Sequence, residues 1–65
     1  MLNSEQIREL QRRLTNIGYP CGIGGTLNKN TTQAYEKFYT DRHITVPDIN
    51  TLTDVPDFKN PPNNP

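Results

Sequence analysis

The stretch CGIGGTLNKNTTQAYEKFY, residues 21–39, decides the fold that this sequence predicts. It begins as a glycine-rich turn, since glycine adopts backbone angles that are closed to other residues. Asn28 or Asn30 can then cap the start of a helix. Residues spaced i, i+3 and i+7 form one face of that helix: Thr31, Ala34 and Phe38. The stretch therefore predicts a turn that leads into a helix over about residues 29–42.

An amphipathic helix is also predicted before this turn. Apolar residues recur on one of its faces at i, i+3, i+7 and i+10: Ile7, Leu10, Leu14 and Ile17. Asn3 or Ser4 can cap its start, and Gly18 stands where a left-handed C-terminal cap is expected. Pro20 cannot continue the helix because it has no amide hydrogen.

A third, shorter helix is predicted further along the chain. Asp48 can cap its start. Three apolar residues would face inward: Ile49, Leu52 and Val55. The preceding segment 43–47 alternates apolar and polar residues, which would lay Ile44 and Val46 on the core.

Residues 56–65 begin with a helix-ending proline and are rich in proline and asparagine. They offer little to bury, which is typical of a linker or a disordered tail. The part before them, residues 1–55, is predicted to form one all-α domain. Its expected architecture is a small three-helix bundle with a glycine-rich loop between the first two helices and a short third helix.

The composition limits the size of the core and the kinds of site. A chain of 65 residues buries about 60% of its unfolded surface, so we expect roughly eight to ten buried apolar side chains. One cysteine and one histidine can form neither an internal disulfide nor a four-ligand zinc site, and no cofactor is expected. A nucleophilic Cys21 would need a positioned base, and His43 is the only histidine. No third group that would orient this base is evident, so a structural or incidental cysteine is favoured.

Charge and hydropathy argue against further classes of partner. Seven basic and seven acidic residues give zero net charge, which disfavours nucleic acid and anionic membranes as partners, and with them a helix-turn-helix DNA binder. No run approaches the ~18 apolar residues of a membrane span. The N-terminus lacks the basic and apolar regions of a secretory signal, and Met1 is compatible with a true start.

Two runs of residues match a family pattern over residues 5–55. The first run reads apolar, two free positions, Leu-Gln, two free, Leu and then Gly-Tyr: Ile7, Leu10-Gln11, Leu14 and Ile17-Gly18-Tyr19. The second covers the turn and the second helix: Gly24 to Thr31, Ala34 and Phe38-Tyr39. The last part of the pattern, Leu-x-Val followed later by Thr-Leu, matches at Ile44-Thr45-Val46 and Thr51-Leu52. In these runs the chain resembles the peptidoglycan-binding domain family, the three-helix module appended to many cell-wall hydrolases.

The chain departs from the family pattern at three positions. Gly24 stands where the family usually has Asp, which removes a carboxylate from the loop. Asn28 replaces a glycine, and Tyr39 replaces a glutamine. The expected fold tolerates these changes, but a ligand role that depends on the loop Asp does not carry over to this chain.

The resemblance implies a non-catalytic module that binds bacterial peptidoglycan as a monomer and concentrates an attached hydrolase at its polymer. The chain itself would not be an enzyme; its partners would be the glycan and stem peptide of the wall and an attached catalytic domain or phage protein. Without a secretory signal, such a protein would act at the cell wall as a phage endolysin released from the cytoplasm, or as part of a phage particle. The alternative is a structural or protein-interaction module that keeps the fold without wall affinity.

Peptidoglycan offers apolar sugar faces, amides and carboxylates, which tyrosine, asparagine, threonine and arginine side chains can bind. Most residues of these types gather on the turn and the second helix, with an arginine on the first helix. The candidate ligand-binding residues are Tyr19, Thr26, Asn28, Asn30, Tyr35, Tyr39 and Arg12. Arg8 and Arg12 share a face of the first helix, and such a pair of arginines usually marks a solvated face.

Most of these candidates have a structural alternative. Tyr35 borders the apolar stripe and is favoured as a core residue over a ligand contact, at about two to one. Tyr19 can cover the end of the first helix, and Tyr39 can stack on Tyr35 or on the following linker. Asn28 and Asn30 are more often caps than binding residues.

Overall fold

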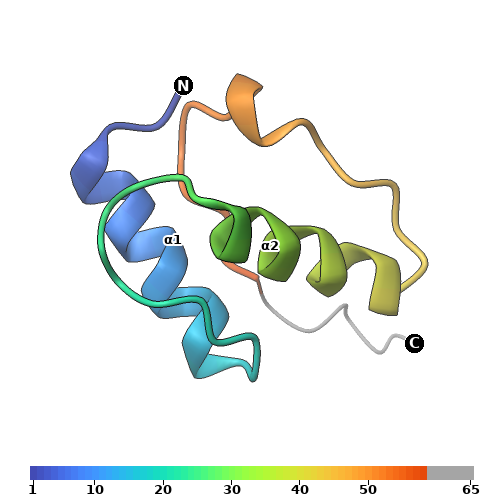
Figure 1. Ribbon diagram of the computed structural model, residues 1–65. Coiled ribbons are helices and arrows are strands. Elements are labelled where there is room, and N and C mark those ends of the chain that lie inside the picture. The colour runs from blue at the N-terminus through green and yellow to red at the C-terminus, as the bar shows by residue number, and fades with distance from the viewer. Residues whose placement is uncertain (59–65) are drawn as a thin grey trace.

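Two α-helices and one 3-10 turn make up the regular structure of residues 1–58 (Figure 1). The computed structural model describes residues 1–58, and this part contains no strand. The elements are α1 (Ser4–Asn16), α2 (Lys29–Asp41) and η1 (Ile49–Thr51). The prediction of an all-helical chain is confirmed. The third element is a 3-10 turn of three residues instead of a helix, so a three-helix bundle is not confirmed.

Helix α1 begins and ends with local hydrogen bonds that its sequence predicts. Asn3 and Gln6 form a capping box, in which each side chain accepts from the other residue's backbone N–H at 2.8 and 2.9 Å. Gly18 adopts a left-handed φ of 99° after the last turn. The N–H of Tyr19 then reaches back to the carbonyl of Leu14 at 2.8 Å, which completes a Schellman motif.

Helix α2 begins at the predicted position and ends one residue earlier than predicted. The side chain of Asn28 accepts from the backbone N–H of Thr31 at 2.8 Å and so caps the helix. At the other end His43 takes the left-handed conformation, with φ of 56°, and the N–H of Ile44 donates to the carbonyl of Tyr39 at 3.0 Å. This end is a second Schellman motif, with histidine in the place that glycine usually takes.

The segment predicted as a third helix stops after one 3-10 turn. Asp48 caps it as expected, by accepting from the N–H of Asn50 at 2.9 Å. The hydroxyl of Thr51 donates to the carbonyl of Asp48 at 2.8 Å, one of the local bonds with which short polar residues compete against a helix. Leu52 and Val55 follow outside the turn, half-buried against the core. Few strong helix formers lie in this short segment, so nothing extends the turn.

The apolar segment after α2 is only partly buried. Val46 packs against the core, as predicted. Ile44 is 43% exposed, so the prediction that it lies on the core is wrong. The physical reason is that Ile44 belongs to the turn that ends α2, where its backbone bonds to Tyr39.

The packed part of the chain extends to Phe58, three residues beyond the predicted domain boundary at residue 55. Phe58 is 3% exposed and meets Phe38 edge-to-face, with ring centroids 4.9 Å apart. Arg13 donates from one guanidinium nitrogen to the carbonyls of Val55 and Pro56 at 3.3 and 3.0 Å. Residues 56–58 therefore contribute to the packed part of the chain. The rest of the predicted tail, residues 59–65, lies outside the described residues.

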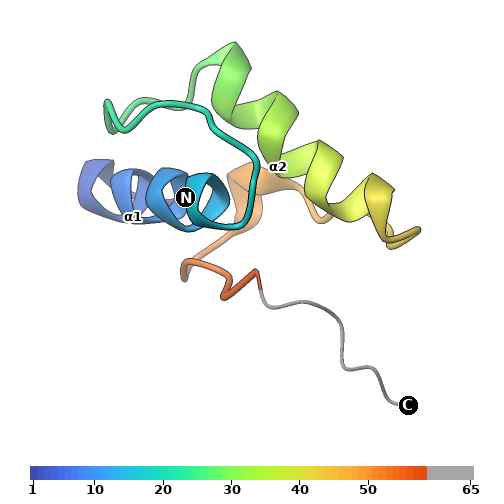
Figure 2. The same ribbon diagram turned by 90° about the horizontal axis from the view of Figure 1, so that it is seen from below.

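The core lies where α1 and α2 cross and is closed by two segments of irregular chain. Its ten buried apolar residues in the described range match the expected size: Leu2, Ile7, Leu10, Leu14, Cys21, Ala34, Tyr35, Phe38, Ile49 and Phe58. Figure 2 shows the loop after α1 on one side of that helix and the C-terminal segment on the other. Helix α1 is therefore covered on two sides.

Candidate functional site

A buried glutamine holds the glycine-rich loop in place. Gln11 on α1 is fully buried, and its Oε1 accepts from the N–H of Gly25 at 2.9 Å. Its Nε2 donates to the carbonyl of Thr26 at 3.1 Å and to the hydroxyl of Thr31 at 2.8 Å. Because the three bonds satisfy the buried amide, Gln11 ties α1, the loop and the start of α2 together.

The loop lies so close to α1 that one glycine is required for both space and backbone angle. Gly25 has φ of 78°, and a Cβ there would lie 3.2 Å from the carbonyl oxygen of Ser4 and 3.4 Å from the guanidinium of Arg8. The hydroxyl of Thr31 also donates to the Asn28 side chain, at 2.9 Å. The loop is thereby held at both ends, at Gly25 and at the cap of α2.

A cleft of about 270 Å³ lies between the turn after α1 and one face of α2. Its walls are formed by Gly18, Tyr19, Pro20, Asn30, Gln33, Ala34 and Lys37. The four residues from α2 are spaced i, i+3, i+4 and i+7, so they share one face of the helix. The cleft combines an apolar surface with two side-chain amides and an ammonium group.

Tyr19 forms one wall of the cleft and is held by polar contacts at its rim. Its hydroxyl donates to the Asp41 carboxylate at 2.7 Å and accepts from the guanidinium of Arg42 at 3.1 Å. The ring meets Phe38 edge-to-face, with centroids 6.1 Å apart. The Tyr19 side chain therefore packs on the C-terminal end of α2 and also lines the cleft.

The cation of the cleft is held only weakly. The ammonium of Lys37 lies 3.9 Å from the Asp41 carboxylate, and the Lys37 side chain is 67% exposed. Such an exposed pair contributes little free energy, about 1 kcal/mol at most. The ammonium is therefore accessible to a ligand.

Two of the predicted tyrosines belong to the core more than to a surface. Tyr35 is 1% exposed, and its hydroxyl donates to the carbonyl of Pro47 at 2.8 Å. Burial is the main reason that the pKa of Tyr35 is raised. Tyr35 contributes to the wall of a second hollow of about 340 Å³ on α2, but it offers almost no surface to a polymer. The prediction that Tyr35 contacts a ligand is therefore corrected: Tyr35 is a core residue, because its ring is buried.

Tyr39 is half-buried and stacks on its neighbours, as its alternative predicts. Its ring centroid lies 5.0 Å from that of Tyr35, 4.9 Å from that of Phe38 and 6.3 Å from that of Phe58. Burial raises the pKa of the Tyr39 hydroxyl. Tyr39 therefore packs mainly in an aromatic cluster with Tyr35, Phe38 and Phe58.

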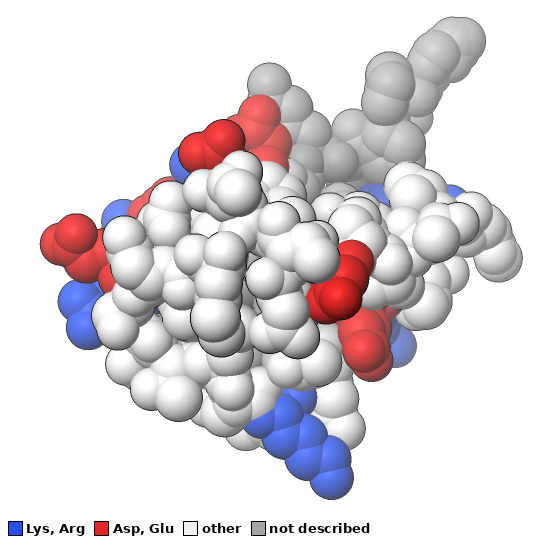
Figure 3. Space-filling view, turned by 90° about the horizontal axis from the view of Figure 1, so that it is seen from above, with Lys and Arg blue, Asp and Glu red and all other residues white. Residues whose placement is uncertain are grey.

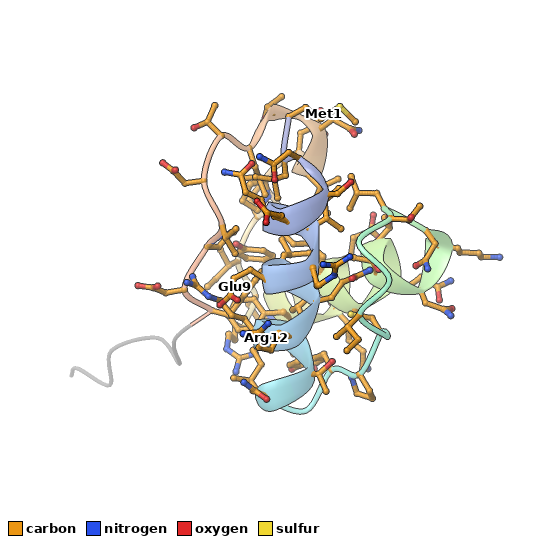
Figure 4. All side chains as sticks on the ribbon, turned by 90° about the vertical axis from the view of Figure 1, so that its left-hand side faces the viewer. Met1, Glu9 and Arg12 are labelled. Atoms are coloured by element: carbon orange, nitrogen blue, oxygen red, sulfur yellow. The ribbon has the colours of Figure 1, made fainter. Side chains whose placement is uncertain are left out.

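The other predicted residues are spread over the surface. Arg12 is exposed on the outer face of α1 beside Glu9, to which it pairs at 3.3 Å (Figure 4). The side chain of Asn28 caps α2. The carbonyl of Thr26 accepts from the Gln11 amide, and the Thr26 residue is exposed. Asn30 is exposed and lines the cleft.

The structure thus brings together two of the predicted residues, Tyr19 and Asn30, and adds residues that the sequence reasoning missed. Gln33 and Lys37 carry a signal that could have been found, because they follow Asn30 at i+3 and i+7. Pro20 carries no such signal, since its place in the wall depends on how the turn folds back over α2.

Cys21 is buried and carries no sign of reactivity. Its thiol lies 3.8 Å from the carbonyl of Gln11, and burial raises the pKa of the thiol. A raised pKa lowers the thiolate fraction, which is the nucleophilic form. These observations support the structural interpretation of this cysteine.

Charged side chains are dispersed on the surface. On the face seen in Figure 3, acidic and basic groups surround a broad uncharged area. Within residues 1–58, no group of three or more His, Cys, Asp or Glu side chains is placed to hold a metal ion. No helix in that same part of the chain has the length and apolar character needed to cross a membrane.

No protein-family model, curated protein or solved structure significantly matches this chain.

Proposed function

We propose that this chain is a peptidoglycan-binding module that brings an attached wall hydrolase, such as that of a phage endolysin, to its polymer. The observation that carries the proposal is a contact between the two runs of residues that resemble the family. Gln11 of the first run bonds through its Nε2 to the Thr31 hydroxyl of the second run, 20 residues further on, at 2.8 Å. One residue from each run of the family pattern therefore takes part in the same buried hydrogen bond.

The arrangement of the elements supports the same proposal. A peptidoglycan-binding-domain-like fold calls for three helices, the third of them short, with a glycine-rich loop between the first two. Helices α1 and α2 and the loop held by Gln11 fit this description, and the turn η1 stands in the place of the third helix.

The cleft supplies chemistry that suits a wall polymer. Pro20, Ala34 and the Tyr19 ring offer apolar surface, while Asn30 and Gln33 offer donors and acceptors for amides and hydroxyls. A small number of polar groups in an apolar cleft is typical of ligand sites.

A second candidate function is a structural or protein-interaction module with the same fold. Gly24 in place of the family's Asp favours it, as does the structural use of Tyr35 and Asn28. The two candidates differ in one measurable property, which is affinity for the wall.

Co-sedimentation of the chain with purified sacculi of several wall chemotypes tests the proposal. We expect retention by sacculi and not by cellulose or chitin. Gln33→Ala should weaken retention roughly 2- to 10-fold, the effect of one lost hydrogen bond. Asn16→Ala is the matched control, because Asn16 is also an exposed helical amide but lies outside the cleft. No retention by any wall would favour the second candidate.

A further inference from the structure

We infer that the cleft recognises the stem peptide of peptidoglycan and not its glycan, with a ligand carboxylate placed at Lys37; this inference rests on the proposed wall-binding function. The peptide would lie extended along the face of α2 that carries Asn30, Gln33 and Lys37. Four features of the cleft support this choice: its aromatic residues, its length, its amides and its charge.

The aromatic residues argue against a glycan ligand. Sugar rings pack their apolar faces on exposed, flat aromatic side chains. The chain has three tyrosines, two phenylalanines and no tryptophan. Of these, Tyr35, Phe38 and Phe58 are buried, and Tyr19 and Tyr39 are half-buried with edge-to-face ring contacts. No aromatic side chain of the protein is therefore fully exposed as a platform for sugar.

The length of the polar face suits about three residues of peptide. Asn30 and Lys37 are seven positions apart in α2, which corresponds to about 10.5 Å along the helix axis. An extended chain rises about 3.3 Å per residue, so three residues span the same distance. The cleft volume of about 270 Å³ accommodates small side chains better than a bulky segment.

The amides are placed to bond a peptide backbone. Asn30 and Gln33 are exposed and one turn apart on the same face of α2. Each offers one acceptor and two donors, which is the complement of a peptide N–H and C=O. Pro20 on the turn and Ala34 beside the amides on α2 leave room for small apolar side chains such as methyl groups.

The charge of the cleft sets the direction of the ligand. Lys37 supplies the only cation among the residues that line the cleft. Its pair with Asp41 is long, at 3.9 Å, and Asp41 also accepts from the Tyr19 hydroxyl. An ammonium has three donors, so Lys37 can bind a ligand carboxylate in addition to Asp41.

A chemical-shift titration of the isotope-labelled 65-residue chain tests the inference with three probes. The probes are a synthetic stem peptide with a free C-terminal carboxylate, the same peptide with a C-terminal amide, and the peptide-free wall disaccharide. We expect the carboxylate peptide to shift the signals of Asn30, Gln33 and Lys37, and the amide to bind about threefold or more weakly. The disaccharide should cause no shift at these residues.

A pair of lysine variants provides the matched control. Lys37→Gln should remove the preference for the carboxylate peptide over its amide. Lys29→Gln, on the same helix but outside the cleft, should leave this preference unchanged.

Retention by sacculi, measured in parallel, separates the inference from the function on which it rests. If sacculi retain the chain but the disaccharide binds and the peptide does not, or neither binds, the inference is overturned and wall binding stands. An unrelated tripeptide that binds as well as the stem peptide also overturns it. Loss of retention by every wall overturns the proposed function itself.

Discussion

Gln11 is a polar residue in the core that links α1 to the glycine-rich loop and to α2. A glutamine on the buried face of an amphipathic helix is a departure from the apolar pattern. Here it is fully buried, and every hydrogen-bonding group of its amide has a partner on the loop or on α2. Since a buried polar group is costly only when unpaired, Gln11 fixes the loop without weakening the core.

Replacing Gln11 with a side chain of similar size and no hydrogen bonds should destabilise the protein. Gln11→Met removes the three hydrogen bonds to Gly25, Thr26 and Thr31, which should lower the free energy of unfolding by roughly 1–3 kcal/mol. Urea unfolding followed by circular dichroism measures the change. Gln33→Met, at an exposed position of α2, should stay within about 0.5 kcal/mol of the parent. Equal stabilities of the two variants would contradict the role of Gln11.

The helices begin and end where local chemistry places them. Both start at an asparagine cap, and both end in a Schellman motif with a left-handed residue, Gly18 in one case and His43 in the other. These signals depend only on residues within a few positions of each other. The capping box of α1 and the cap of α2 are therefore visible in the sequence.

Alanine in place of the capping glycine should cost stability through backbone angle alone. Gly18 has φ of 99° and no atom within 4 Å of an added Cβ, so Gly18→Ala meets strain without a clash. We expect a loss of about 1–2 kcal/mol, the cost of the left-handed conformation for a residue with a Cβ. Gly24→Ala serves as the control, because Gly24 also has open space and lies outside the left-handed region. A loss of the same size at both glycines in thermal unfolding would rule out this explanation.

The C-terminal segment adds to the cover of the core, where the expected third helix is only one 3-10 turn. Phe58 enters the aromatic cluster of Tyr35, Phe38 and Tyr39, while Arg13 holds the preceding carbonyls. The Phe58 ring thereby adds to the cover that Ile49, Leu52 and Val55 provide. Nothing in the periodicity of the sequence indicates this role.

Removal of the Phe58 ring should strongly destabilise the whole domain. Phe58→Ala should cost about 3–5 kcal/mol, since it empties a space in a small core. Asp57→Ala, in the neighbouring position, should cost about 1 kcal/mol or less because the Asp57 side chain is 66% exposed in its pair with Arg13. Thermal melts of both variants, and of chains that end after residue 55 or after residue 58, measure the effect. If the chain that ends at residue 55 melts like the longer one, the segment has no structural role.

At the scale of the whole molecule, charge balance separates specific binding from adsorption. The net charge is zero, and on the face shown in Figure 3 the charged groups are dispersed. Long-range attraction to an anionic wall polymer would need clustered basic residues. The proposed binding through the cleft would depend instead on short contacts and a single ammonium.

Wall binding should therefore respond only weakly to salt. Raising the salt concentration from about 0.1 M to 1 M shortens the Debye length from about 10 Å to 3 Å. Retention by sacculi should weaken no more than about fivefold, because one exposed ion pair contributes about 1 kcal/mol at most. A basic protein that adsorbs to the same sacculi serves as the comparison and should be released. Complete release of this chain at high salt would instead indicate adsorption.

Much of the local structure follows from the sequence by itself. The two helices, their asparagine caps, the left-handed Gly18 and the cap at Asp48 arise from contacts between residues at most five positions apart. Helical periodicity also identifies most of the apolar faces and the size of the core. These features are predictable because they are set by backbone hydrogen bonds and side-chain spacing within one segment.

Only the tertiary structure decided which distant residues meet. Gln11 and Thr31 are 20 residues apart, and Arg13 and Pro56 are 43 apart. The burial of Phe58, the exposure of Ile44 and the walls of the cleft all depend on how α1 and α2 cross and on how the irregular segments cover them. The candidate site was therefore only half visible: its residue types could be named, but helix packing chose which of them share a surface. In a core this small, each bulky side chain is buried where space remains, and that space exists only after the helices have packed.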